Sequence, residues 1–155
     1  MRGLVRVGAA VPSLALGNVK ENMKRHLAMM REAKEKHVSI VTFPELSLTG
    51  YTCGDLFFQR RLLDDVTDAL LALKDEMPEG ILRVVGAPLE IEDALYNCAV
   101  VLHKGEIISA VPKTFLPNNG EFYEKRWFQS GDARRDASVA IPKLKTDVCR
   151  QAIFE

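Results

Sequence analysis

Three charged residues stand where their side chains could do chemistry together. Glu45 follows an apolar run and a proline, residues 40–44, and precedes a turn that contains Gly50. A strand that ends by presenting an acid into a loop places that acid on a rigid base. Lys113 and Glu121 lie eight positions apart in a second loop, rich in proline and asparagine. Acyl transfer to a thiol needs such groups as base, oxyanion partner and orienter.

Taken singly, each of these residues has an ordinary explanation. An acid or a lysine after a strand is commonly a solvated surface residue. Glu121 could stand in the first turn of a short helix over residues 121–126, where its charge suits the helix dipole. The functional hypothesis rests on the combination, because a lysine held between two carboxylates stays charged and fixed in place. Glu45, Lys113 and Glu121 would then act as base, oxyanion partner and orienter.

The cysteines bear on both compartment and mechanism. Cys53, Cys98 and Cys149 are an odd number without metal-type spacing, which argues against a disulfide framework and for a reducing compartment. We therefore expect a cytoplasmic protein. A cysteine that acts as nucleophile would need a base to become a thiolate at neutral pH.

The bulk composition excludes several classes of protein. The 21 basic residues balance 21 acidic ones, so net charge gives no attraction to nucleic acid or to an anionic membrane. No stretch approaches the ~20 apolar residues of a membrane span. Arg6 and Pro12 interrupt the apolar N-terminal run, which indicates a strand rather than a signal peptide. The three histidines have no second ligand at metal spacing, so no metal site is expected.

The spacing of apolar residues predicts alternating strands and helices. We expect strands over residues 4–10, 38–43, 81–87, 95–102 and 106–111, and helices over 19–36 and 61–77. Asn18 is a favourable N-cap for the first helix, and Lys104-Gly105 predicts a tight turn. Residues 140–145 are expected to form a loop, and 151–155 to begin another strand. The predicted class is α/β, a mixed sheet with helices on one face.

Three segments resemble the nitrilase, or carbon–nitrogen hydrolase, superfamily. They are Phe43-Pro44-Glu45-Leu46-Ser47-Leu48-Thr49-Gly50-Tyr51, Tyr96-Asn97-Cys98-Ala99-Val100-Val101 and Lys113-Thr114-Phe115-Leu116-Pro117-Asn118. More narrowly, the pairing of Thr49-Gly50-Tyr51 with residues 54–57, and of Leu116-Pro117-Asn118 with residues 121–128, resembles the N-terminal glutaminase domain of glutamine-dependent NAD synthetases. The resemblance covers nearly all of residues 1–155, in order.

The resemblance implies a site and a reaction. By motif position Glu45 would be the general base, Lys113 the group that stabilises the tetrahedral intermediate, and Glu121 the supporting second glutamate of a Glu-Lys-Cys triad. Tyr51 and Phe122 fall where the subfamily lines its glutamine pocket. The implied reaction releases ammonia from glutamine for the amidation of deamido-NAD. The domain itself would need no cofactor, whereas ATP with Mg would serve the synthetase domain.

The resemblance also implies that residues 1–155 are the N-terminal part of a larger domain. The family fold is a four-layer α-β-β-α sandwich, of which this chain would supply about the first half, with the synthetase domain absent. Cys53, Cys98 and Cys149 lack the family's elbow motif of a glycine and an aliphatic pair before the cysteine and an acid after it. We therefore expect the nucleophile beyond residue 155, and an inactive isolated chain.

Half a sandwich would leave one sheet face uncovered, and large exposed apolar patches drive association. We therefore expect the isolated chain either to associate, as a homo-oligomer, or to be poorly stable. Two alternatives stay open at this stage. One is another nitrilase-type amidase or carbamoylase, and the other is a non-catalytic association module with a nitrilase-like fold.

Overall fold

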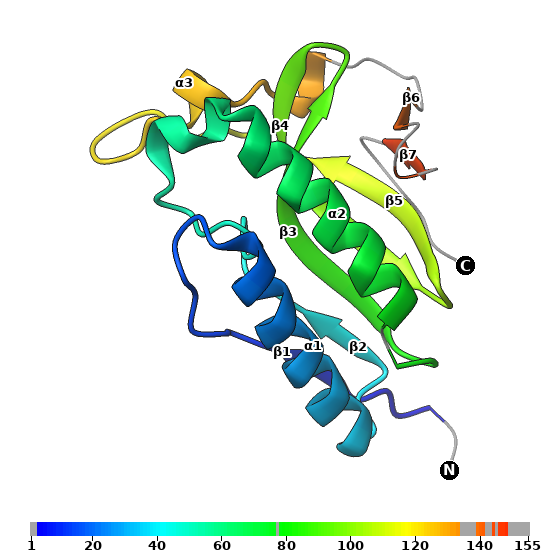
Figure 1. The fold of residues 1–155 in the computed structure, drawn as a ribbon. Coiled ribbons are helices and arrows are strands. Elements are labelled where there is room, and N and C mark those ends of the chain that lie inside the picture. The colour runs from blue at the N-terminus through cyan, green and yellow to red at the C-terminus, as the bar shows by residue number, and fades with distance from the viewer. Residues whose placement is uncertain (1–2, 77, 134–138, 142–143, 145, 149–155) are drawn as a thin grey trace.

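The computed structural model describes residues 3–76, 78–133, 139–141, 144 and 146–148. In it, two long helices lie across one face of a twisted sheet (Figure 1). The helical elements are α1 (Val19–Glu35), η1 (Gly54–Phe58), α2 (Arg60–Glu76), α3 (Glu124–Trp127) and η2 (Gly131–Ala133). The strands are β1 (Val7–Ala9), β2 (Ile40–Thr42), β3 (Leu82–Ile91), β4 (Ala94–His103), β5 (Glu106–Pro112), β6 (Val139–Ile141) and β7 (Thr146–Val148).

The strands form one mixed sheet in the order β1-β2-β3-β4-β5-β7-β6. β1, β2 and β3 pair in parallel, because α1 and α2 carry the chain back between them. β3, β4 and β5 pair antiparallel through tight turns. The predicted α/β class, with a mixed sheet and helices on one face, is confirmed.

The two long helices form where the sequence predicts them. The Asn18 side chain caps α1 by accepting a hydrogen bond from the Glu21 backbone N–H at 3.1 Å, as expected. α2 begins one residue before the predicted start, at Arg60. Their apolar stripes face inward, and no helix among the described residues is both long and apolar enough to cross a membrane.

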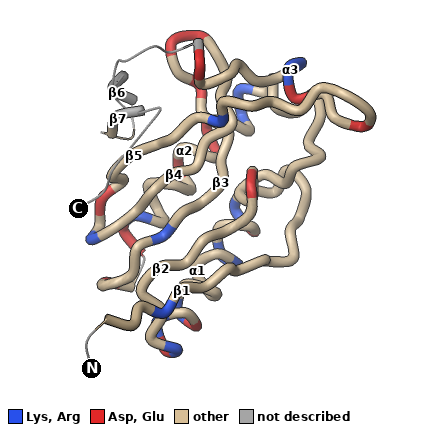
Figure 2. Tube along the Cα trace, turned by 180° about the vertical axis from the view of Figure 1, so that it is seen from behind, with Lys and Arg blue, Asp and Glu red and all other residues tan. Residues whose placement is uncertain are grey.

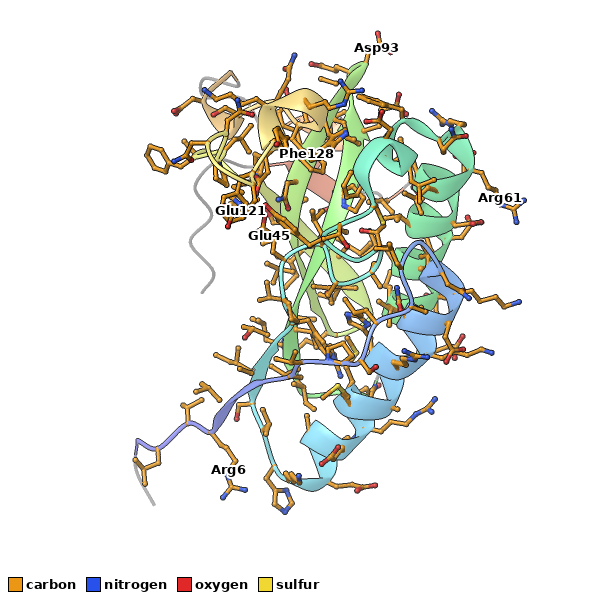
Figure 3. The ribbon with its side chains drawn as sticks, turned by 90° about the vertical axis from the view of Figure 1, so that its left-hand side faces the viewer. Arg6, Glu45, Arg61, Asp93, Glu121 and Phe128 are labelled. Carbon is orange, nitrogen blue, oxygen red and sulfur yellow. The ribbon has the colours of Figure 1, made fainter. Side chains whose placement is uncertain are left out.

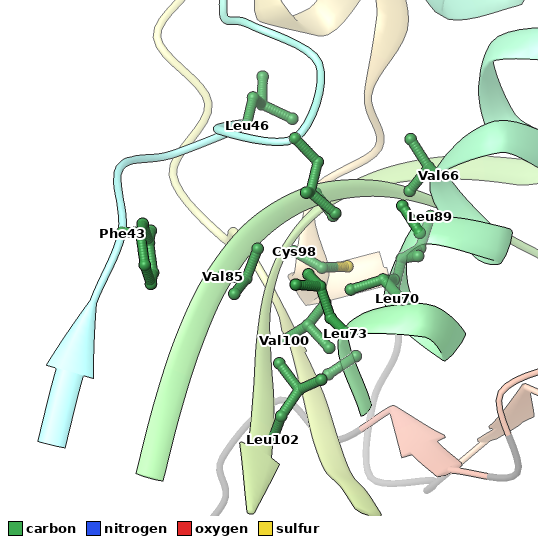
Figure 4. Close-up of a cluster of buried hydrophobic side chains, with 14 of the residues drawn as sticks. Phe43, Leu46, Val66, Leu70, Leu73, Val85, Leu89, Cys98, Val100 and Leu102 are labelled. Atoms are coloured by element: carbon green, nitrogen blue, oxygen red, sulfur yellow. The ribbon is translucent and has the colours of Figure 1, made fainter. Parts of the chain in front are cut away.

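The core between helix and sheet extends up to the turn over residues 45–49, which is called the Glu45 turn below. Leu70 and Leu73 of α2 pack toward Val85 of β3 and its neighbours, and Phe43 and Leu46 continue this cluster on either side of Glu45 (Figure 4). Phe43 is 8% exposed and Leu46 only 1%. The acid therefore stands on a loop whose flanking residues are part of the core, and this makes the loop rigid.

Several predicted boundaries differ from the structure. β3 runs on to Ile91 and β4 begins at Ala94, because Glu92 and Asp93 both adopt positive φ angles and make a two-residue hairpin turn. That turn lacks the glycine or asparagine that usually signals it. Residues 140–145 were expected to be a loop, but β6 includes residues up to Ile141. The strand predicted over 151–155 lies outside the described residues.

The middle strands of the sheet carry few charged residues. Figure 2 views the sheet from the side that α1 and α2 leave open, and the charged residues of these strands lie mainly toward the strand ends. The charged residues of β3, β4 and β5 are Arg83, Glu90 and Glu106. A sheet with so few charges can pack against a further apolar layer.

Gly86 on β3 is the floor on which the Glu45 turn rests. A Cβ atom at Gly86 would lie 2.3 Å from the Pro44 carbonyl oxygen and 2.4 Å from the Leu46 backbone nitrogen. We expect Gly86→Ala to lower the free energy of unfolding by about 1–3 kcal/mol, because backbone must move to make room. Urea unfolding of the variant measures this.

Gly8→Ala in β1 is the matched control for this substitution. There the added Cβ would meet only side-chain methyl groups, those of Val38 at 3.4 and 3.8 Å and one of Val41 at 3.9 Å, which is ordinary contact. Equal destabilisation by the two substitutions would contradict the role assigned to Gly86.

Candidate active site

Glu45 stands on a tight turn whose backbone is fixed at several points. The Gly50 N–H donates to the Leu46 carbonyl at 2.8 Å, and the Leu48 N–H donates to the Gly86 carbonyl at 3.2 Å. Leu46 has a φ of 52°, a left-handed conformation that costs energy for a non-glycine residue. Such strain persists only where the surroundings hold it, so the direction of the Glu45 side chain is built into the fold.

Lys113 follows β5 and brings two carboxylates together. Its Nζ lies 2.7 Å from Glu45 Oε1 and 2.8 Å from Glu124 Oε1. The lysine backbone is held as well, because its N–H donates to the Asn97 carbonyl at 2.7 Å and its carbonyl accepts from the Gly131 N–H at 2.9 Å. The predicted meeting of Glu45 and Lys113, 68 residues apart in the chain, is therefore present in the structure.

The carboxylate that supports the lysine is Glu124, not Glu121. The side chain of Glu124 is 2% exposed and its Oε1 also accepts a hydrogen bond from the Tyr51 hydroxyl at 2.6 Å. Glu121 is exposed, and among the described residues no hydrogen bond or ion pair joins it to Lys113, although it lies on the same side of the molecule as Glu45 (Figure 3). The assignment of Glu121 as orienter is corrected for this reason: the loop folds so that α3, three residues on, turns its first carboxylate inward.

The local electrostatics keep the lysine charged. Burial lowers the pKa of Lys113, but its hydrogen bonds to Glu124 and Glu45 and the charges of both carboxylates raise it, and the net pKa is raised. Burial and the hydrogen bond to Glu124 raise the pKa of Tyr51 above its usual range. Tyr51 thus keeps its proton and acts as a donor at any physiological pH.

Tyr51 and Phe122, the predicted pocket residues, also lie together. Their rings meet edge to face with centroids 6.4 Å apart. Phe122 is 38% exposed, so part of this residue is accessible from solvent. The structure thus places Tyr51 against the Glu124 carboxylate and Phe122 against Tyr51, while their role in binding stays a prediction.

Sequence reasoning missed Asn97, whose side-chain amide donates to Glu45 Oε1. Asn97 is 3% exposed in the middle of β4. A buried amide within an apolar strand is a signal that could have found it, because such a group must have a polar partner. Lys113 and Asn97 together hold the same oxygen of Glu45.

Residues 6–155 match the carbon–nitrogen hydrolase family. The chain belongs to this family. Among curated proteins it is 41% identical to the glutamine-dependent NAD(+) synthetase of Mycobacterium tuberculosis over 134 residues, which cover 86% of this chain and 20% of that protein. It is 36% identical to the Mycobacterium leprae protein of the same name over 157 residues, covering 99% and 22%.

Solved structures agree with this assignment. The structure of a glutamine-dependent NAD(+) synthetase from Cytophaga hutchinsonii matches with a TM-score of 0.85 and 28% identity, over 93% of this chain and 25% of that one. An amidase from a Nesterenkonia species matches with a TM-score of 0.69 and 20% identity, over 82% and 48%, and so shares the fold. This carbon–nitrogen hydrolase chain spans about a fifth to a quarter of the length of the curated relatives it matches.

Besides the Tyr51–Glu124 hydrogen bond, a second set of contacts joins the segment after Tyr51 to α3. Asp55 of η1 binds the Arg126 guanidinium through both oxygens, at 2.7 and 2.8 Å, and accepts from the Trp127 indole N–H at 3.0 Å. These contacts hold the pKa of Asp55 well below its usual range. In this hydrolase, α3 is therefore held at the surface by the contacts of Asp55 with Arg126 and Trp127, and on its buried side by the hydrogen bond of Tyr51 to Glu124.

The described cysteines of this hydrolase are poorly suited to attack a substrate. Cys53 is buried, its thiol donates to the Thr49 carbonyl at 3.2 Å, and burial raises its pKa. Cys98 is buried within β4. Cys149 lies outside the described residues. In the part of the chain that the structure describes, no group of three or more His, Cys, Asp or Glu side chains could hold a metal ion.

Glu124→Gln and Glu121→Gln separate the two candidate supporting carboxylates. We expect Glu124→Gln to lower the pKa of Lys113, because the lysine loses one of its two anionic partners, and to lower the free energy of unfolding by about 1–3 kcal/mol. Glu121→Gln should change neither quantity appreciably. An NMR titration of the Lys113 side chain and urea unfolding measure both. If Glu121→Gln lowered the pKa of Lys113 more than Glu124→Gln does, Glu121 would be the supporting carboxylate after all.

Proposed function

We propose that this chain is the N-terminal part of a glutamine amidohydrolase domain, which releases ammonia from the side-chain amide of glutamine within a glutamine-dependent NAD synthetase. The observation that carries the proposal is the Lys113 ammonium held between Glu45 and Glu124. The curated relatives are glutamine-dependent NAD(+) synthetases, which supports the choice of glutamine as substrate. The ammonia would pass to an ATP-dependent synthetase region outside this chain.

Glu45 is assigned the role of general base. The hydrogen bonds from Lys113 and Asn97 both go to Oε1, which leaves Oε2 as the oxygen that can take a proton. The side chain is 40% exposed, so a thiol and a substrate can reach it. A carboxylate with one oxygen fixed and the other accessible can take a proton from the thiol and return one to the leaving ammonia.

Lys113 is assigned the stabilisation of the oxyanion. An ammonium group has three N–H donors, and Glu45 and Glu124 accept from it. A third donor remains for the negative oxygen of a tetrahedral intermediate. Because the lysine is already held in place, this stabilisation needs little reorganisation during the reaction.

The thiol is assigned to a cysteine outside this chain, because Cys53 and Cys98 are buried and the sequence around Cys149 lacks the elbow motif of the family. Its sulfur would attack the amide carbon of glutamine as Glu45 takes the thiol proton. Collapse of the tetrahedral intermediate would break the carbon–nitrogen bond, and Glu45 would give its proton to the departing ammonia. Water would then attack the thioester, and glutamate would leave with the thiol restored.

The aromatic pair Tyr51 and Phe122 is assigned to the substrate pocket. Two packed aromatic rings, one of them hydrogen-bonded to the buried Glu124 carboxylate, suit a small polar substrate with an apolar stem. Under this assignment Tyr51 serves two purposes, since its hydroxyl fixes Glu124 and its ring lines the pocket.

The test is an assay of the full-length protein that contains this chain. Ammonia release is measured with glutamine, asparagine, simple aliphatic amides and carbamoyl compounds. The proposal expects glutamine to be preferred, and expects added ammonium to support amidation of deamido-NAD when glutamine hydrolysis is blocked. Preference for another amide would favour a nitrilase-type amidase. No hydrolysis of any amide would favour an association module.

A further inference from the structure

A buried polar network lies beneath the Glu45 turn and takes no part in the proposed chemistry. Asn22, His26, Ser47 and Thr49 are each 0% exposed. Asn22 and His26 stand one helical turn apart on α1, whereas Ser47 and Thr49 belong to the turn itself. Burial of four polar side chains in one place is costly unless each is hydrogen-bonded, so their contacts show what they hold.

His26 contacts two residues that flank Glu45 in the sequence, Phe43 on one side and Ser47 on the other. Its Nε2 lies 2.9 Å from the Ser47 hydroxyl oxygen, and its ring packs on Phe43 with centroids 4.4 Å apart. Phe43 precedes Glu45 by two positions and Ser47 follows it by two. Among the described residues, His26 makes no hydrogen bond or ion pair with Glu45 itself.

The tautomer of His26 follows from its partners. Nδ1 lies 2.7 Å from the Asn22 backbone carbonyl, which can only accept, so Nδ1 carries the proton. Nε2 is then the acceptor, and the Ser47 hydroxyl donates to it. Burial lowers the pKa of His26 despite this backbone hydrogen bond, which agrees with a neutral ring.

Asn22, also on α1, holds the next part of the Glu45 turn by hydrogen bonds. Its side-chain amide donates to the Leu48 carbonyl at 3.0 Å and to the Ala15 carbonyl at 2.9 Å, and its Oδ1 accepts from the Ala15 N–H at 2.8 Å. The turn is therefore held by α1 on one side and by Gly86 below. Leu46, the residue in the left-handed conformation, has its backbone nitrogen close above Gly86 and is followed directly by Ser47, which His26 contacts.

We propose that His26 is a positioning residue for Glu45, holding the acid's direction toward Lys113 through Ser47 and Phe43. This inference rests on the proposed function only for its effect on rate. The placement of Glu45 can be measured without activity, because Lys113 reports the nearness of the Glu45 carboxylate.

The test uses the full-length protein with His26→Phe, Ser47→Ala and the double variant. His26→Phe keeps an aromatic ring against Phe43 but removes both hydrogen bonds. We expect it to lower kcat for glutamine hydrolysis about tenfold to a hundredfold, with KM changed by less than about twofold. Ser47→Ala should also lower kcat. The kcat of the double variant should be no lower than that of the more affected single variant, because both substitutions remove the same hydrogen bond between His26 and Ser47.

Two further variants separate positioning from loss of stability. His26→Gln can still accept from Ser47 through its amide oxygen, and should recover most of the lost kcat. Met30→Ala, one turn further along α1 and equally buried, is the control for stability. At a temperature where wild type and Met30→Ala are both folded, Met30→Ala should keep kcat within about twofold of wild type.

The second readout is the pKa of Lys113, measured by NMR titration. It should fall in His26→Phe and Ser47→Ala and stay unchanged in Met30→Ala, since only the first two let the Glu45 carboxylate move. If wild type hydrolyses no glutamine, the proposed function fails and the Lys113 pKa still decides the positioning role. If His26→Phe does not fold, Ser47→Ala supplies the same test. An unchanged kcat and Lys113 pKa in Ser47→Ala, or equal losses in Met30→Ala, would overturn the inference.

Discussion

Glu45→Gln is expected to lower kcat for glutamine hydrolysis about 10²- to 10⁴-fold in the full-length protein, the range that general acid–base catalysis contributes. Glutamine has the same shape as glutamate and can still accept hydrogen bonds from Lys113 and Asn97 through its amide oxygen. It cannot take a proton from the thiol. The loss should therefore fall on kcat, with a smaller effect on KM and on the free energy of unfolding. Steady-state ammonia release measures it.

The matched control for this variant is Glu90→Gln. Glu90 is an exposed acid on β3 that pairs with Arg60, away from the site. Its substitution should leave kcat unchanged. Added ammonium should support amidation of deamido-NAD in Glu45→Gln as well as in wild type, because only the release of ammonia is lost. Wild-type kcat in Glu45→Gln would remove Glu45 from the chemistry.

Lys113→Met is expected to affect rate and stability together. Loss of the donor to the oxyanion should lower kcat about 10²- to 10³-fold. The same change leaves the buried Glu124 carboxylate with the Tyr51 hydroxyl as its remaining hydrogen-bond donor among the described residues, which should lower the free energy of unfolding by about 1–3 kcal/mol. Methionine keeps most of the side-chain volume, so packing loss is small.

The pH dependence separates the two effects of Lys113→Met. The raised pKa of Lys113 means that its stabilising effect is fully present below the ordinary lysine pKa, and is lost as pH rises through the folded-state value. Wild type and variant should therefore differ in stability at neutral pH and converge in strongly alkaline solution. Lys125→Met, an exposed neighbour on α3, is the control. Equal stability of wild type and Lys113→Met at neutral pH would contradict the buried pairing.

Much of the fold could be predicted because its signals are local. The N-cap at Asn18 and the helical spacing of apolar residues fixed α1 and α2 to within about a residue or two. The β3–β4 hairpin was harder, because Glu92 and Asp93 take left-handed conformations without the usual turn residues. There the long pairing of the two strands overrides the weak local preference of the turn.

The candidate site divides in the same way. The sequence by itself determined that an acid follows β2 and a lysine follows β5, since each stands directly after an apolar strand. Which carboxylate shares that lysine was decided by tertiary structure, because Glu121 and Glu124 lie three residues apart and only the path of the loop selects between them.

Tertiary structure also decided which residues hold the base. Asn97 reaches Glu45 from β4, and His26 reaches the Glu45 turn from α1, 21 residues before Ser47. Nothing local to a buried asparagine or histidine says which loop it will meet, because the meeting depends on how strands and helices pack. The sequence therefore determined the reactive groups and their elements, and packing alone decided the partners that give those groups a fixed direction.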